Sequence, residues 1–272
     1  MFLEYIKSLI LGIVEGITEW LPISSTGHMI LVNELMKTGD GFFGSQIYLY
    51  VIQLGAILAI ATLYFKKLNP FSPSKTKEEK RATWDMWFKV IAACIPAAVI
   101  GLLFNDYMDA ISTPAVVSAT LIIYGIAFIL IERRNKKASV TDMNQMTCKT
   151  ALLIGLFQVL SIIPGTSRSG STILGAILIG CSRELAAEFS FFLAIPVMFG
   201  ASLLKVIKYF IKVGLFSFGQ LFLLLLGTFV AFVVSLFAIK ALLNYVKSHD
   251  FTIFGWYRII LGIFVIIFFY VI

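Results

Sequence analysis

The sequence has few charged residues. Asp, Glu, Lys and Arg together make up 14% of its 272 residues, against about a quarter in soluble domains. Apolar residues reach 59%. This balance excludes an ordinary water-soluble domain, because too little polar surface is available to cover so much apolar side chain. The composition predicts an all-α, polytopic membrane protein.

Cysteine is also scarce, with three residues that are widely spaced and form no Cys-x-x-Cys pattern. This excludes a disulfide framework and a cysteine zinc site. The net charge of +7 is not accompanied by a basic recognition motif, so we expect no nucleic acid partner. In a membrane protein, cytoplasmic loops enriched in Lys and Arg explain the positive charge.

Six apolar segments have lengths close to the roughly 20 residues that cross hydrocarbon as a helix. They are 47–65, 90–104, 115–131, 187–204, 218–239 and 253–272. Basic residues gather in 66–89 and 132–149, which the positive-inside tendency places in the cytoplasm. We expect an acidic turn at 105–109 to lie outside, and Tyr257-Arg258 to be an interfacial anchor of the last span.

Two further segments, near 15–31 and 150–180, are interrupted by Pro, Gly and Ser. A straight span through the first would place Glu15, Glu19 and His28 in lipid. Non-helical backbone is tolerated at membrane depth where it lines a protein cavity. We therefore predict two re-entrant helical hairpins.

The two hairpins resemble each other, because 22–31 aligns with 164–174 if one residue is inserted. Each half of the single domain, 1–131 and 150–272, then holds one hairpin and three crossings. Three is odd, so the sequence predicts an inverted-topology repeat whose broken helices meet near the midplane. Lysines at 205–212 would lie outside, against the positive-inside tendency.

The first hairpin carries two acids. Glu15 and Glu19 are four residues apart and share a helix face, which suits a divalent cation or a general base. The alternative is an acid that snorkels to the interface.

Hydroxyls and an imidazole follow Pro22, at Ser24, Ser25, Thr26 and His28. A helix that starts near Ser25 would aim its amides at an anion, with Ser25 or His28 as nucleophile and proton-transfer partner. The alternative is that these hydroxyls only cap a kinked helix.

The second hairpin places Arg168 among small polar residues. A guanidinium at membrane depth needs an anion or a carboxylate, and its planar fork suits phosphate. An ion pair of Arg168 with Glu15 or Glu19 in an empty core is the alternative. The expected hydrogen-bond donors beside Arg168 are Ser167, Ser169 and Thr172.

Two stretches resemble the bacterial undecaprenyl-diphosphate phosphatase family associated with bacitracin resistance: EGITEWLPISSTGH at 15–28 and PGTSRSG at 164–170. The resemblance extends over nearly the whole chain, including 53–59 and 188–191. It implies a multi-pass enzyme of the bacterial plasma membrane that hydrolyses undecaprenyl diphosphate to the monophosphate, recycling the lipid carrier for peptidoglycan. It also implies dependence on Mg²⁺ or Ca²⁺ and a site that opens to the extracytoplasmic face.

The resemblance assigns Glu15 and Glu19 to metal binding, Glu19 also to acid-base work, Ser25 to the nucleophile, His28 to catalysis and Arg168 to the diphosphate. The expected partners are a polyprenyl diphosphate and membrane lipids, with a homodimer left open. A transporter or flippase of a polyprenyl phosphate lipid is the alternative, because inverted repeats with broken midplane helices are common in transporters. The number of catalytic residue types favours an enzyme.

Overall fold

The computed structural model describes residues 2–39, 41–134 and 137–271, without the side chains of 105, 106 and 109. Within these ranges the regular secondary structure is helical, apart from one isolated bridge between Val140 and Cys181, so the predicted all-α class is confirmed. The helices are α1 (Phe2–Thr18), α2 (Ser25–Leu35), η1 (Phe42–Gly44), α3 (Gln46–Leu63), α4 (Phe65–Leu68), α5 (Lys77–Ala110), α6 (Pro114–Arg133), α7 (Cys148–Val159), η2 (Leu160–Ile162), α8 (Arg168–Ile179), α9 (Arg183–Lys212), α10 (Phe218–Val246) and α11 (Thr252–Tyr270).

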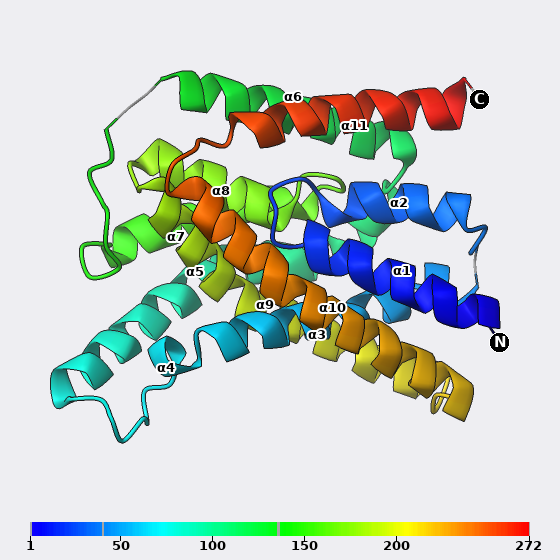
Figure 1. The fold of residues 1–272 in the computed structure, drawn as a ribbon, viewed down its shortest axis with the longest axis horizontal. Helices are drawn as coiled ribbons and strands as arrows, with labels where there is room; N and C mark the ends of the chain where they lie inside the picture. Colours follow the sequence, from blue (N-terminus) through cyan, green and yellow to red (C-terminus); the bar gives the residue numbers. More distant parts are fainter. Residues whose placement is uncertain (1, 40, 135–136, 272) are drawn as a thin grey trace.

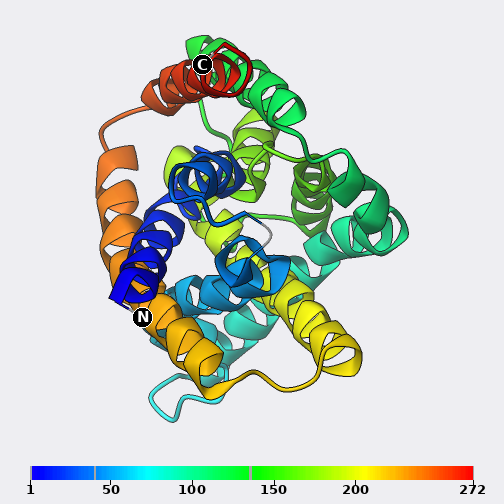
Figure 2. The same cartoon turned by 90° about the vertical axis from the view of Figure 1, so that its right-hand side faces the viewer.

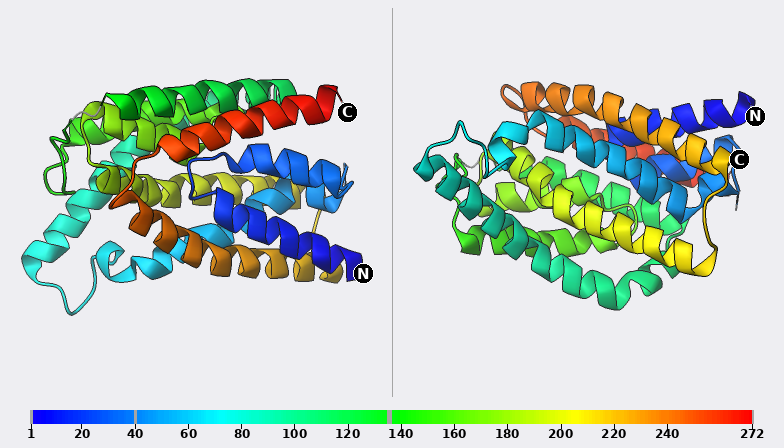
Figure 3. Two further views of the ribbon diagram at one scale, coloured as in Figure 1. Left: turned by 45° about the horizontal axis from the view of Figure 1, so that its top comes forward. Right: turned by 90° about the horizontal axis from the view of Figure 1, so that it is seen from below.

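Six helices of the described chain are long and apolar enough to cross a membrane: α3, α5, α6, α9, α10 and α11. Each contains or overlaps one of the six predicted segments. They run roughly along a common direction (Figure 3), and large apolar side chains such as Phe237 and Ile260 are exposed on them. Exposed apolar helix faces suit lipid rather than water, and the chain is a polytopic membrane protein.

The predicted turn at 105–109 is wrong. α5 continues through this stretch to Ala110, and the chain turns at 111–113 instead. The start of α6 sets that position, because Thr113 accepts a hydrogen bond from the backbone N–H of Val116 and Pro114 occupies the first helical turn.

The first basic loop is also shorter than predicted, since α5 begins at Lys77 rather than near 90. A reciprocal capping box explains this start: Thr76 Oγ1 accepts from the N–H of Glu79, and Glu79 accepts from the N–H of Thr76. In the second basic loop, residues 135 and 136 lie outside the described part of the chain.

The two predicted helical hairpins are present as α1 with α2 and as α7 with α8. In Figure 1 the α1–α2 pair opens to the right and the α7–α8 pair opens to the left, so their tips approach each other in the middle of the fold. Seen end-on in Figure 2, α2 and α8 lie near the centre, with α5, α6, α9, α10 and α11 around them. Residues 169–176 of α8 are all buried.

Glycines hold each hairpin close to a long helix. A Cβ added at Gly12 or Gly16 of α1 would lie 2.7 or 2.8 Å from a backbone oxygen of α10. A Cβ at Gly155 of α7 would lie 2.2 Å from the carbonyl oxygen of Ala93 in α5. Small residues let helix backbones approach closely in membranes. The long helices therefore fix where both hairpin tips lie.

Candidate active site

In both hairpins the second helix begins after a serine N-cap, and the backbone of that serine lies in the left-handed region. Ser24 has φ of 73° and Ser167 has φ of 70°, and their hydroxyls accept from the N–H groups of Gly27 at 3.3 Å and Gly170 at 3.1 Å. A non-glycine residue in this region is strained and persists only where its surroundings fix it. The predicted helix start at Ser25 is confirmed. Each hairpin thus presents a helix N-terminus, with its partial positive charge, near the centre of the fold.

One carboxylate connects the two hairpins. Glu19 Oε1 accepts a hydrogen bond from Nη2 of Arg168 at 2.9 Å, and Glu19 Oε2 accepts from Oγ of Ser25 at 2.9 Å. The side chains of Glu19 and Arg168 are 6% and 10% exposed. The ion pair of Arg168 with Glu19, which was the alternative to an anion site, is therefore present, and it lies against the predicted nucleophile Ser25.

The Arg168 guanidinium is held from several sides. Nη1 donates to the carbonyl oxygen of Ser190 at 3.0 Å, and Nη2 also approaches Sδ of Met198 at 2.8 Å. The centre of the guanidinium lies 5.7 Å from the ring of Trp20, which is itself buried edge-on against Phe191. Nε of Arg168 is buried and has no hydrogen-bond partner among the described residues. One strong donor is therefore still unused.

Glu15 is buried on the last turn of α1, and its Oε1 has no hydrogen-bond partner in the described part of the chain. The helical turn continues past α1, because the N–H of Glu19 donates to the carbonyl oxygen of Glu15 at 3.0 Å. Burying an unpaired carboxylate oxygen costs free energy unless the oxygen binds a proton or a cation. No group of three or more His, Cys, Asp and Glu side chains gathers among the described residues.

Both ring nitrogens of His28 are engaged. Nδ1 lies 2.8 Å from the carbonyl oxygen of Ser24, and Nε2 lies 2.7 Å from the hydroxyl of Tyr257. A carbonyl oxygen only accepts, so Nδ1 carries the hydrogen and Nε2 of the neutral ring accepts from Tyr257. The two rings stack with centroids 5.6 Å apart. Tyr257 was predicted as a membrane anchor, and its contact with His28 was not foreseen.

The other hydroxyls predicted to bind substrate differ in their surroundings. Besides the two serine N-caps, Ser169 donates to the carbonyl oxygen of Glu19 at 3.1 Å. Thr172 lies 2.6 Å from the hydroxyl of Ser190 and is fully buried. Thr26 is exposed on the first turn of α2. The substrate-binding role of these residues stays a prediction.

The prediction that Arg258 is an interfacial anchor is wrong. Its side chain is fully buried, and its Nη atoms donate to the carbonyl oxygens of Pro22, Gly165 and Thr166 at 3.2, 3.1 and 2.8 Å. The signal was in the sequence, since an arginine inside a predicted apolar span is costly unless it faces polar groups. The acceptors lie far away in sequence, so only the fold reveals them.

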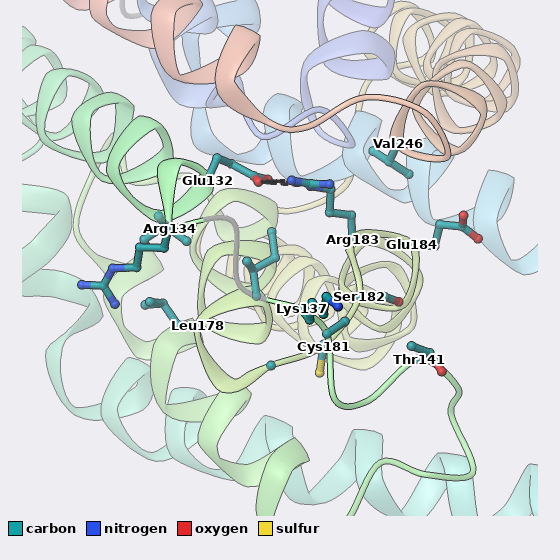
Figure 4. Close-up of a pocket in the computed structure, with 14 residues that line it drawn as sticks. Glu132, Arg134, Lys137, Thr141, Leu178, Cys181, Ser182, Arg183, Glu184 and Val246 are labelled. Atoms are coloured by element: carbon teal, nitrogen blue, oxygen red, sulfur yellow. Dashed lines mark hydrogen bonds and ion pairs between the residues drawn. The ribbon is translucent and has the colours of Figure 1, made fainter.

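A pocket of about 540 Å³ lies away from this site, at the end of α8 remote from Arg168 (Figure 4). It contains a further carboxylate–guanidinium pair, in which Nη2 of Arg183 donates to Oε2 of Glu132 at 2.6 Å. Arg134 and Lys137 also line the pocket. This pair has a chemistry similar to that of Glu19 and Arg168, but it is distant from the hairpin tips and serves as a comparison.

The chain matches the Bacitracin resistance protein BacA family over residues 8–264. It is 59% identical over 265 residues to the undecaprenyl-diphosphatase of Enterococcus faecalis, with 96% of each chain covered. It is 58% identical over 267 residues to the enzyme of the same name from Leuconostoc citreum, covering 96% of this chain and 95% of the relative. For the Streptococcus thermophilus protein the identity is 57%, with 97% and 93% covered. These matches span nearly the full length of both partners, and the chain belongs to the Bacitracin resistance protein BacA family.

Proposed function

We propose that this protein hydrolyses undecaprenyl diphosphate to undecaprenyl phosphate and inorganic phosphate, which recycles the lipid carrier for peptidoglycan synthesis. The observation that carries the proposal is the chain of contacts from Ser25 through Glu19 to Arg168. It joins a hydroxyl, a base and an anion-binding guanidinium at the meeting point of two helix N-termini. The name undecaprenyl-diphosphatase, borne by relatives that match over nearly their full length, agrees with this chemistry.

In the proposed first step, Oγ of Ser25 attacks the terminal phosphorus of the diphosphate, and its proton passes to Oε2 of Glu19. The bond from that phosphorus to the bridging oxygen breaks, and undecaprenyl phosphate leaves. Water then hydrolyses the phosphoserine and releases inorganic phosphate. In the alternative course, water attacks the phosphorus directly and no phosphoserine forms.

Arg168 would bind the diphosphate and stabilise the charge that develops on its oxygens. Its unpaired Nε supplies a donor, and the pairing with Glu19 balances its charge when no substrate is bound. The helix N-termini at Ser25 and Arg168 add partial positive charge. His28 would transfer a proton at Nε2, the nitrogen that faces Tyr257.

Glu15 and Glu19 would hold a divalent cation, Mg²⁺ or Ca²⁺. The unpaired, buried oxygen of Glu15 fits this role, because carboxylate oxygens are the ligands that both ions prefer. Two carboxylates supply only part of a coordination sphere, and substrate phosphate and water commonly complete it for Mg²⁺. When bound, the cation would neutralise negative charge on the diphosphate.

We also propose that the two halves, 1–131 and 150–272, form an inverted repeat and that the site opens to the extracytoplasmic face. The matched left-handed N-caps at Ser24 and Ser167 and the opposite directions of the hairpins in Figure 1 support the repeat. The gathering of basic residues in 66–81 and 132–149 supports placing that end in the bacterial cytoplasm. A homodimer stays part of this proposal, and mass measurement of the solubilised protein tests it.

The test is phosphate release from undecaprenyl diphosphate by purified protein in detergent. The unaltered protein should release phosphate, chelator should stop the release and added Mg²⁺ or Ca²⁺ should restore it. Arg168→Ala should lower kcat/KM by about 100-fold or more, as expected for loss of a main electrostatic contact. If the unaltered protein releases no phosphate but moves labelled lipid between the leaflets of vesicles, the flippase alternative replaces this proposal.

Labelled terminal phosphate distinguishes the two courses of the reaction. A single turnover should leave label on the unaltered protein and none on Ser25→Ala. If the unaltered protein turns over without becoming labelled, water attacks the phosphorus directly.

A further inference from the structure

Arg258 is a fully buried arginine that the proposed chemistry does not use. It lies in the second turn of α11, and its hydrogen-bond partners among the described residues are backbone carbonyls rather than carboxylates. The ring of Tyr124 in α6 lies 5.5 Å from the guanidinium. A buried charge without an opposite charge is expensive, so this position needs an explanation.

The acceptors of Arg258 explain where it acts. Nη1 donates to the carbonyl oxygen of Pro22, in the break of the first hairpin. Nη2 donates to the carbonyl oxygens of Gly165 and Thr166, in the break of the second. Breaking a helix leaves its last carbonyls without intrahelical partners, and at membrane depth such groups must be satisfied by protein. One guanidinium satisfies carbonyls from both breaks.

Neighbouring contacts hold the same region. A Cβ added at Gly170, in the first turn of α8, would lie 3.0 Å from Nη1 of Arg258. In α6, Thr120 donates from Oγ1 to the carbonyl oxygen of Pro164 at 2.8 Å. α11 packs along α6. Both helices therefore contact the break of the second hairpin, and Arg258 of α11 also contacts the break of the first. Arg258 thus bridges the Pro22 carbonyl, six residues before His28, and the carbonyls of residues 165 and 166, which lie just before the helix that begins at Arg168.

We infer that Arg258 is a positioning residue that clamps the two hairpin breaks together, so that Glu19 and Ser25 on one hairpin meet Arg168 on the other. The inference rests on the proposed phosphatase function. Arg258 acts through backbone carbonyls, and its described contacts do not include Glu19, Ser25 or Arg168. Misplacement of reacting groups by about 1 Å can cost about 100-fold in rate.

The clamp requires an arginine rather than any cation. The planar guanidinium presents five N–H donors in a fixed fork, which lets two nitrogens reach carbonyls on separate segments. Lysine offers one ammonium nitrogen on a flexible stem. If the residue supplied only positive charge to attract the diphosphate, Arg258→Lys would retain activity. A clamp predicts that Arg258→Lys loses nearly as much kcat as Arg258→Gln.

The experiment compares Arg258→Lys and Arg258→Gln with Arg183→Gln. This control removes an arginine that is also bonded to a buried acceptor, Glu132, but lies away from the hairpin breaks. For both Arg258 variants we expect kcat to fall about 100-fold and KM to change less than about threefold. Hydrogen exchange, measured by mass spectrometry, should lose protection in 19–27 and 163–170. Arg183→Gln should keep kcat within about twofold and leave exchange in both breaks unchanged.

A second variant tests the clamp without removing any charge. Gly170→Ala puts a methyl group 3.0 Å from Nη1 of Arg258, and it should lower kcat about tenfold with faster exchange in both breaks. A folded Arg258→Gln with unaltered kcat would overturn the inference. Lost kcat with unchanged exchange would also overturn it, since Arg258 would then act as a charge. If the unaltered protein releases no phosphate, the proposed function fails, while exchange in the breaks still decides whether Arg258 clamps them.

Discussion

Glu19→Gln is the substitution that separates the catalytic and structural roles of the central ion pair. Glu19 accepts from Arg168 on one oxygen and from Ser25 on the other, and its side chain is 6% exposed. Glutamine keeps the shape of the side chain and retains one carbonyl oxygen for Arg168. Its amide nitrogen then faces Ser25 and cannot take the serine proton. The charge and the base are both lost, while the packing is conserved.

The expected effects follow from the burial of the pair. A positioned general base contributes about 100- to 10,000-fold, so kcat should fall by about 1,000-fold. Removing one partner of a buried ion pair costs about 3–5 kcal/mol. Because the amide oxygen still accepts from Arg168, we expect about 3 kcal/mol, the lower end of that range. Unfolding should therefore occur at a lower temperature, and activity should fall much further than the folded fraction.

Glu132→Gln is the matched control. Glu132 is buried and accepts from Nε and Nη2 of Arg183, at the far end of α8. Arg183 is 37% exposed, so solvent screens this pair and we expect a loss of about 1 kcal/mol. Activity should stay within about twofold. Phosphate release and thermal unfolding, both in detergent, measure the two effects. The reasoning fails if folded Glu19→Gln keeps kcat within about threefold, or if Glu132→Gln loses as much activity.

Four further predictions concern other parts of the molecule. Tyr257→Phe removes the hydroxyl that meets Nε2 of His28 at 2.7 Å, and kcat should fall about three- to tenfold, the value of one hydrogen bond; an unchanged kcat would exclude a role for this contact. Burial raises the pKa of the Cys181 thiol to about 11, so at pH 8 roughly one thiol in 1,000 is ionised; a maleimide should label exposed Cys148 and spare Cys181 until the pH approaches 11. An impermeant maleimide should reach Cys148 only after cells are opened, and labelling of intact cells would reverse the proposed orientation. Gly55→Ala would place a methyl group 2.0 Å from a backbone oxygen of α10 and should destabilise the fold by about 1–3 kcal/mol, measured by thermal unfolding.

Hydropathy and helix-breaking residues were sufficient to predict the six long helices and both hairpins. The ends of α5 were harder to predict, because the stretches 77–89 and 105–110 contain several polar residues, which water can solvate whether or not the backbone is helical. Short-range capping decided these ends, through Thr76 with Glu79 at the start and Thr113 with Pro114 after the end. These capping residues are visible in the sequence, but a prediction based on the length of apolar segments overlooks them.

The central contacts were predicted in part. The residue types at Glu19, Ser25 and Arg168 led to the prediction of an anion site, because polar and charged groups are costly in lipid without a partner. The structure brings the three residues together. Arg258 was misinterpreted, since only the packing of α11 against both hairpins shows that the residue faces carbonyls. Ser169 was likewise predicted to bind substrate, whereas in the fold its hydroxyl donates a hydrogen bond to the carbonyl oxygen of Glu19. Sequence indicates that a polar group needs a partner, and the fold determines which partner it finds.

The breaks in the two hairpins leave polar and charged groups that need partners inside the protein. Three kinds of contact satisfy them. Serine N-caps satisfy freed N–H groups, Arg258 satisfies freed carbonyls, and Glu19 balances the charge of Arg168. Among the described residues, Nε of Arg168 and one oxygen of Glu15 are buried without a hydrogen-bond partner. The two helix N-termini carry partial positive charge. In the proposed function, an anionic diphosphate would supply an acceptor for Nε of Arg168 and for the helix N-termini. A divalent cation that arrives with it would supply a positive charge for Glu15. Such complementarity, spread over two hairpins, would require both of them for the proposed reaction.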